Sequence, residues 1–150
     1  MNDTNTPIHF ERSHDILINA TPSAVLDYVC NPNSWPEWLA ASHHIDSEDR
    51  PLRKGDHFVE KWHTKTGEAI LNWSVTDCEP GKYWIGETYT DFLGTIIVRY
   101  DVTDTDGQTR FTRTVINPSR PKAATDKMIA AMDEEAKIAL ANIKRNVEMS

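Results

Sequence analysis

The chain is poor in cysteine and in positive charge, and each shortage excludes a class of protein. Its 150 residues include only two cysteines, Cys30 and Cys78. A chain of this length buries enough surface to fold without a disulfide or a metal, so we expect two free thiols in a reducing compartment. Lys and Arg number 16 against 23 Asp and Glu, which gives a formal net charge of -7. This balance disfavours nucleic acids and anionic membranes, whose binding proteins carry dense basic faces.

Long apolar runs and familiar catalytic motifs are missing as well. No segment is apolar for long enough to cross a bilayer, and residues 1–6 lack the basic and then apolar pattern of a signal peptide. We therefore expect a cytoplasmic protein with no membrane partner. The sequence also lacks the signatures of serine hydrolases, zinc proteases, dinucleotide-binding folds and P-loops. Its six histidines do not have the spacing of metal ligands, so we predict no metal and no cofactor.

A capped helix follows the first strand of the chain. Residues 9–19 have an extended, apolar pattern. Thr21 can cap a helix because its hydroxyl accepts a free backbone N–H, and Pro22 has the φ of a first helical position. The helix is predicted over residues 22–30, and a second short helix over residues 34–41.

The middle of the chain alternates between apolar and polar residues with the period of a β-strand. Strands are predicted over residues 44–49, 57–64, 68–78, 82–90, 95–103 and 109–116. A tight turn is predicted at residues 65–67, and Asp106-Gly107 is a strong hairpin signal because Gly takes φ > 0 without steric cost. Strands joined by hairpins pair with their neighbours in sequence, so we expect an antiparallel meander.

The last part of the chain predicts one long helix. Residues 117–121 end the β region, and residues 122–148 contain no Gly or Pro and are rich in Ala, Lys and Glu. One stripe at three- and four-residue spacing is apolar: Met128, Ile129, Met132, Ala136, Ala139, Leu140, Ile143 and Val147. We expect one domain over residues 8–150, preceded by a disordered lead-in at residues 1–7.

Alternation within the strands predicts which side chains point toward this helix. The apolar inner set is Phe58, Trp62, Ala69, Leu71, Trp73, Val75, Ile96, Val98, Tyr100, Val102, Phe111 and Val115. Residues 82–90 have no assignable face, because Tyr83 and Ile85 favour one side and Trp84 the other. The same alternation turns two charges inward, Glu60 and Arg113; alternatively, a β-bulge leaves one of them outside.

Two inward charges have a chemical interpretation and a structural one. Because a buried, unpaired charge is costly, Glu60 and Arg113 must pair, lose charge, or meet water or a ligand. In an enzyme, Glu60 would be the base, and Arg113 or Tyr100 would hold an oxyanion. In a binding protein, Tyr100 is a core aromatic and the two charges form an ion pair. Both interpretations stay open at this point.

Several motifs, in this order along the chain, are similar to those of a known superfamily. They are Ile18-x-Ala20-Thr21-Pro22-x-x-Val25, Trp35-Pro36-x-Trp38, Trp73-x-Val75 leading to Glu79-Pro80, and Gly107-x-Thr109-Arg110-Phe111. This pattern resembles the START/Bet v 1-like (SRPBCC) superfamily, and within it the bacterial polyketide cyclase/dehydrase-like branch. The resemblance implies an α+β helix-grip fold: a seven-stranded antiparallel sheet wrapped around a long C-terminal helix, with two short helices after the first strand. It also implies a cavity between sheet and helix, and it carries no catalytic motif.

These observations lead to one main hypothesis and two rivals. We expect a hydrophobic small molecule, aromatic or lipid-like, to bind in the cavity of a monomer or homodimer. The residues expected to contact it are Trp38, Phe58, Trp62, Leu71, Trp73, Val98, Tyr100, Phe111, Met128 and Met132. The first rival is a cyclase- or dehydratase-like lyase that uses Glu60, Arg113 and Tyr100. The second is a protein-interaction module with an exposed apolar patch at Trp35 and Trp38.

Overall fold

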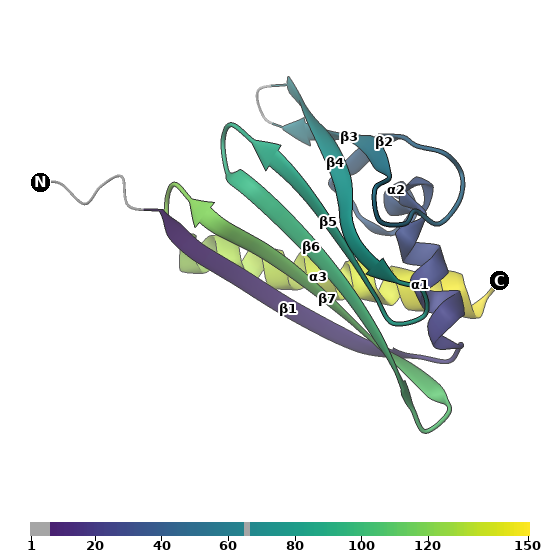
Figure 1. The fold of residues 1–150 in the computed structure, drawn as a ribbon. Coiled ribbons are helices and arrows are strands. Elements are labelled where there is room, and N and C mark those ends of the chain that lie inside the picture. The colour runs from purple at the N-terminus through teal and green to yellow at the C-terminus, as the bar shows by residue number, and fades with distance from the viewer. Residues whose placement is uncertain (1–6, 65–66) are drawn as a thin grey trace, which may run out of the picture.

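A seven-stranded sheet curves around one long helix in the computed structural model, which describes residues 7–64 and 67–150 (Figure 1). The strands are β1 (Ile8–Ile18), β2 (Ser42–Asp46), β3 (His57–Thr64), β4 (Gly67–Glu79), β5 (Tyr83–Thr90), β6 (Gly94–Thr105) and β7 (Gln108–Arg120). The helical segments are α1 (Pro22–Cys30), the 3₁₀ helix η2 (Pro32–Ser34), α2 (Trp35–Trp38) and α3 (Asp126–Glu148). The long helix α3 runs along the sheet behind β1 and β7, and α1 lies near its C-terminal end (Figure 1).

The strand order is β1-β7-β6-β5-β4-β3-β2, and all neighbours are antiparallel. Only the β1–β7 pair joins strands that are distant in sequence. Every other pair joins two strands that follow each other along the chain. The predicted meander is therefore confirmed, with β1 added at one edge. The helix-grip fold that the resemblance implies is confirmed with it.

Two hydroxyl caps set where the main helices begin. Thr21 accepts a hydrogen bond from the backbone of Ala24 at 3.1 Å, and α1 starts at Pro22 as predicted. Thr125 accepts one from Met128 at 3.1 Å, so α3 begins at Asp126 and the prediction of a start at residue 122 is wrong. The second helix is also shorter than predicted, because Leu39 is already extended.

The last strand runs farther than the sequence pattern predicts. β7 continues through Pro118 to Arg120, although residues 117–121 were expected to end the sheet. A register shift between Ile8 and Phe10 lies opposite Pro118, and pairing with β6 begins only at Ile116. Proline is tolerated there because no neighbouring strand needs its missing N–H.

The hairpin signal at Asp106-Gly107 is confirmed. Asp106 has φ 52° and Gly107 φ 87°, so both central residues take the positive φ that a type I′ turn requires. The predicted tight turn at residues 65–67 and the predicted lead-in at residues 1–7 fall mostly on residues 65–66 and 1–6, which lie outside the described ones.

The predicted inner faces are confirmed in β4 and β6. Leu71, Trp73 and Val75 are buried, whereas Ile70, the apolar exception on the other face, is 60% exposed. β5 had no assignable face, and the structure buries Trp84 completely and leaves Tyr83 and Ile85 half-buried. Every second residue of β5 from Trp84 onward therefore points to the core.

The two predicted inward charges do point inward. β3 pairs with β4, and β7 with β6, in a register without shifts, so no bulge in these pairs turns Glu60 or Arg113 outward. Glu60 is 1% exposed, and Arg113 is half-buried.

Trp35 lies at the centre of an aromatic cluster that fills one end of the core. Its ring meets Phe58 and Trp73 edge to face, with ring centroids 5.2 and 5.6 Å away, a favourable geometry for aromatic pairs. Its indole N–H donates to the carbonyl of Val29 at 2.9 Å. Because Trp35 and Trp38 are both buried, the exposed patch that would favour an interaction module is absent at these two residues.

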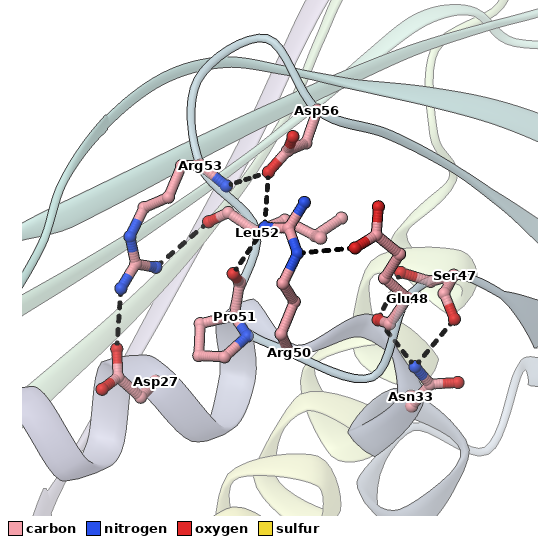
Figure 2. Close-up of polar contacts among 9 residues, drawn as sticks. All are labelled: Asp27, Asn33, Ser47, Glu48, Arg50, Pro51, Leu52, Arg53 and Asp56. Atoms are coloured by element: carbon pink, nitrogen blue, oxygen red, sulfur yellow. Dashed lines mark hydrogen bonds and ion pairs between the residues drawn. The ribbon is translucent and has the colours of Figure 1, made fainter.

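The loop between β2 and β3 closes this end of the core through polar contacts (Figure 2). Asp56 accepts hydrogen bonds from Arg50 at 3.0 Å and from the backbone of Arg53 at 2.7 Å. Asn33 of η2 donates to two carbonyls of the loop, and the Arg53 guanidinium reaches Asp27 of α1. These contacts hold Leu52, 1% exposed, against the core.

Candidate functional site

A cavity of about 310 Å³ lies between the inner face of the sheet and α3. β1, β3, β4, β6 and β7 contribute to its wall, together with α2, the residues that follow α2, and α3. Most of the wall is apolar or aromatic and includes Trp35, Trp62, Trp73, Val98, Val115 and Met132. A mostly apolar hollow of this volume with a few polar groups is typical of small-molecule sites.

The structure brings most of the sequence-predicted site residues to this cavity. The residues that line it are Glu60, Trp62, Trp73, Val98, Tyr100, Arg113 and Met132. Five others do not line it: Trp38, Phe58, Leu71, Phe111 and Met128.

Those five residues lie elsewhere for simple geometric reasons. Leu71 and Phe111 are fully buried in the solid part of the core, and Phe58 stacks on Trp73 with ring centroids 5.9 Å apart. Trp38 is buried beneath the guanidinium of Arg113. Met128 lies in the first turn of α3 and is 44% exposed. Their assignment as ligand contacts stays a prediction without support from this geometry.

Glu60 is the most deeply buried acid at the cavity. Its Oε1 accepts a hydrogen bond from the indole N–H of Trp73 at 3.0 Å. Its Oε2 is buried without a hydrogen-bond partner among the described residues. Burial raises the pKa of Glu60, and this effect outweighs the opposing influence of Ser42, Trp62, Trp73 and Arg113. The cavity therefore favours the neutral, protonated form of this side chain.

Tyr100 and Arg113 present two hydrogen-bond donors next to each other. They lie opposite each other in the β6–β7 register and line the same cavity. Tyr100 is fully buried, and its ring stacks on Trp84 with ring centroids 5.2 Å apart. Burial raises the pKa of Tyr100, although the charge of Arg113 opposes this. The hydroxyl therefore remains a neutral donor, and within the described part of the chain neither it nor Nε of Arg113 has a hydrogen-bond partner.

The ion pair between Glu60 and Arg113, one of the alternatives left open by the sequence, does not form. Among the ion pairs of the described residues none joins the two. Arg113 is also the weakest of the main influences on the pKa of Glu60. The cavity wall thus holds a carboxyl, a hydroxyl and a guanidinium that each have an atom without a hydrogen-bond partner among the described residues. Buried polar groups in proteins are nearly always hydrogen-bonded, so these three are candidates to bind water or a ligand.

A charged clasp joins β1 to α3 at the cavity rim. Arg12 binds both carboxylate oxygens of Asp133 at 2.8 and 2.6 Å, and Nε2 of His14 lies 2.8 Å from Oδ1 of the same residue. Arg12 and His14 both line the cavity. These contacts hold the N-terminal half of α3 against the sheet, where the helix buries few apolar side chains.

The clasp and several other wall residues were missed by the sequence analysis. The missed residues are Phe10, Arg12, His14, Trp35, Leu39, Ala41, Leu93, Ile96, Val115, Asn117, Arg120, Glu135 and Ala136. Phe10, Arg12 and His14 do alternate along β1, and this spacing was a usable signal. Because two of the three side chains are polar, the same spacing is also typical of a solvent-exposed face.

Among the side chains that the structure describes, no three from His, Cys, Asp or Glu converge as metal ligands. The helices described are all too short or too polar to cross a bilayer. Cys30 and Cys78 are both free thiols.

Comparison with sequence models of protein families shows to which family this chain belongs. Residues 7–148 match the sequence model of the family described as polyketide cyclase / dehydrase and lipid transport. The chain therefore belongs to this family. No curated protein sequence matches it.

Solved structures with a similar fold share little sequence with this chain. The di-domain aromatase/cyclase StfQ from the steffimycin biosynthetic pathway has a TM-score of 0.74 at 13% identity, over 95% of this chain and 52% of that one. Ara h 8.0201 has a TM-score of 0.71 at 9% identity, over 95% and 100%. The ZhuI aromatase/cyclase from Streptomyces sp. R1128 has a TM-score of 0.66 at 14% identity, over 94% of each chain. At these identities the likeness concerns the fold alone.

Proposed function

We propose that the protein binds an aromatic small molecule in the cavity between the sheet and α3. One observation carries this proposal: a hollow of about 310 Å³ with a mostly apolar wall and unused polar groups at Glu60, Tyr100 and Arg113. Its volume lies at the lower end of the range of ligand pockets, about 300–1,000 Å³. We further propose a cytoplasmic monomer or homodimer without a nucleic-acid or membrane partner, which the net charge of -7 supports.

The wall favours a ring system over a long acyl chain. Trp35, Trp62, Trp73 and Tyr100 offer aromatic surface, which pairs well with other rings in stacked or edge-to-face geometry. The cavity has the volume of about ten water molecules, each of which takes about 30 Å³ in the liquid. A compact aromatic ligand would fill such a space.

Tryptophan fluorescence of the full chain tests the proposal directly. Three indoles line the cavity, so titration with a panel of aromatic compounds should change the emission. Native mass spectrometry after gentle purification would detect a ligand carried through from the cell. An unchanged emission across the panel, together with an empty mass spectrum, would reject the proposal.

A matched pair of helix variants places the binding inside the cavity. Ala136 is buried and lines the cavity, whereas Ala141 is exposed on the same helix. Ala136→Phe should fill part of the hollow and weaken binding by about tenfold or more, because an inserted ring removes ligand volume or strains the packing. Ala141→Phe should leave the affinity unchanged.

A cyclase- or dehydratase-like activity is the second candidate, and Glu60 is the reason to keep it. A buried carboxyl with a raised pKa is a stronger base once ionised than an exposed one, which suits it to proton transfer. It would take the proton on the carbon next to a ligand carbonyl, and Arg113 and Tyr100 would hold the enolate oxygen that forms. The family description supports this class of reaction.

Glu60→Gln separates catalysis from binding. The amide keeps an oxygen for the Trp73 indole but cannot accept the proton as a carboxylate does. If the protein cyclises or dehydrates a synthetic β-polyketone, the variant should lose turnover by at least about a hundredfold and keep ligand affinity. Normal turnover in Glu60→Gln would exclude Glu60 as the base.

A further inference from the structure

We propose that the ligand is an aromatic acid, whose carboxylate or ionised enol or phenol oxygen is bound jointly by Arg113 and Tyr100. The inference rests on the proposed function and specifies the chemical class of the ligand.

Arg113 differs from the two other arginines of the cavity in having no partner for its charge. Arg12 is paired with Asp133, with the shortest contact at 2.6 Å. Arg120 lies over the ring of Phe10 and donates from Nε to the carbonyl of Lys122 at 2.7 Å. Arg113 makes no ion pair among the described residues, and its Nε is buried without an acceptor. It is therefore the arginine whose binding capacity remains free.

Trp38 contacts the Arg113 guanidinium without using its hydrogen-bond donors. The central carbon of the guanidinium lies 5.7 Å from the ring centroid of Trp38, within the range of a cation–π contact. A cation–π contact uses none of the N–H groups of a guanidinium, so these stay free to donate. Since Arg113 lines the cavity, we expect them to reach an oxygen of a ligand.

Tyr100 supplies a second donor beside the first. It lies opposite Arg113 on the neighbouring strand, is 0% exposed, and its hydroxyl has no partner within the described structure. Charge-assisted hydrogen bonds from a guanidinium and a hydroxyl to one anionic oxygen are short and strong. A pair of buried donors side by side discriminates in favour of an anion.

The protein itself does not supply that anion. Glu60 is the buried acid of the cavity, yet it makes no ion pair with Arg113, and its burial favours the neutral form. Glu135, the other acid of the wall, is exposed to solvent on α3. A half-buried cation left without a counter-charge is costly, and an acidic ligand removes that cost.

Two compounds that share one ring system test this inference. 2-Naphthoate and 2-naphthamide differ in charge but hardly in shape, and both are small enough for the cavity. Tryptophan quenching and calorimetry on the full chain, at neutral pH and physiological ionic strength, should show naphthoate binding about tenfold or more tighter than the amide.

Three variants assign that preference to named side chains. Arg113→Gln should reduce naphthoate affinity by about tenfold or more and change naphthamide affinity by less than about threefold. Tyr100→Phe removes only the hydroxyl and should reduce naphthoate affinity by about threefold to tenfold. Arg110→Gln is the matched control, because Arg110 lies on the same strand, is exposed, and pairs with Asp15 away from the cavity. It should leave both affinities unchanged.

The possible failures are distinguishable. If neither compound nor any other aromatic binds, the proposed function fails and this inference with it. If both compounds bind equally well, aromatic binding stands and the acidic ligand is rejected. If the preference survives undiminished in folded Arg113→Gln and Tyr100→Phe, binding of the acid by these two side chains is rejected. Should Arg113→Gln not fold, the naphthoate preference of the wild type and its reduction in Tyr100→Phe decide the question.

Discussion

The indole of Trp73 donates a hydrogen bond of 3.0 Å to the carboxyl of Glu60, and both side chains are almost completely removed from solvent. The bond spans neighbouring strands, β3 and β4, at the cavity wall. It satisfies one oxygen of Glu60 and leaves the other without a partner among the described residues. The protein therefore keeps a carboxyl where an apolar side chain would pack more easily, and the pH dependence of stability should reveal it.

Glu60 should destabilise the fold at neutral pH relative to Gln. Its pKa in the folded state is raised above 4.5. The contribution of Glu60 to the free energy of unfolding is therefore most favourable below pH 4.5, and it is lost as the pH rises through the folded pKa. We predict that Glu60→Gln raises the free energy of unfolding at neutral pH by on the order of 1 kcal/mol. Urea denaturation of both proteins at several pH values checks this.

The difference in free energy of unfolding between the wild type and Glu60→Gln does not contain the effect of the other acids. Asp56 and Asp133 have lowered pKa values, so they weaken the fold in acid, in both proteins alike. The difference between variant and wild type should therefore shrink toward pH 4.5. A difference that is constant with pH would show that Glu60 is not held neutral by burial.

The cap of α1 gives a prediction about the fold alone. Thr21 accepts the backbone N–H of Ala24, and α1 buries Val25, Leu26 and Val29 in the core. Thr21→Ala should lower the free energy of unfolding by about 1 kcal/mol, because one N–H loses its acceptor. Thr21→Ser keeps the hydroxyl and should restore most of the loss. Equal stability of the Ala and Ser variants would contradict the capping role.

The Asp133 clasp should control the mobility of the cavity rim. Asp133→Asn weakens the contacts to Arg12 and His14, so amide hydrogen exchange in the N-terminal half of α3 should become faster. Mass spectrometry of proteolytic peptides measures this, with peptides from β4 as an internal reference. Glu134→Gln changes the exposed neighbouring acid and should leave the exchange unchanged.

The same clasp predicts a loss of rim protection in acid. Hydrogen bonds from Arg12 and His14 lower the pKa of Asp133 below its ordinary value of 3.8. The stabilisation that Asp133 provides is therefore present above pH 3.8 and is lost as the pH falls through the folded pKa. Once corrected for the intrinsic pH dependence of exchange, wild-type protection of this helix segment should fall toward that of Asp133→Asn in acid. Protection that stays constant would exclude the carboxylate as the clasp.

Strand alternation predicted the inner faces of most strands and the polar part of the site, whereas the helix-grip arrangement was predicted from the family resemblance. Glu60 and Arg113 each lie two residues away from apolar residues of their own strand, and residues two apart share one face of a strand. When that face packs on a helix, the charged residues turn inward with the apolar ones. Alternation does not tell how far along a strand the cavity extends. For this reason Leu71 and Phe111, which have the right phase, were predicted as ligand contacts although the structure packs them in solid core.

The rim was harder to predict because its residues have two roles. Arg12 and His14 line the cavity and also bind a helix residue more than a hundred positions away. A polar side chain that faces a cavity has the same sequence pattern as one that faces water. Only the docking of α3 on β1 distinguishes the two, and that docking is a property of the tertiary structure.

The face of β5 could not be predicted because Tyr83 and Ile85 favour one side and Trp84 the other, and the next inward position is a glycine. Gly86 lies two residues after Trp84 on the inner face, and a Cβ there would come within 2.8 Å of Cη2 of Trp84 and 3.4 Å of Cε3 of Trp73. Gly86→Ala should therefore lower the free energy of unfolding by about 1–3 kcal/mol. Trp84→Phe removes the atoms that the new methyl group meets, so the double variant should be more stable than the two single effects predict. Chemical denaturation of all four proteins measures this coupling, and strictly additive effects would show that Gly86 is not required by the packing of Trp84.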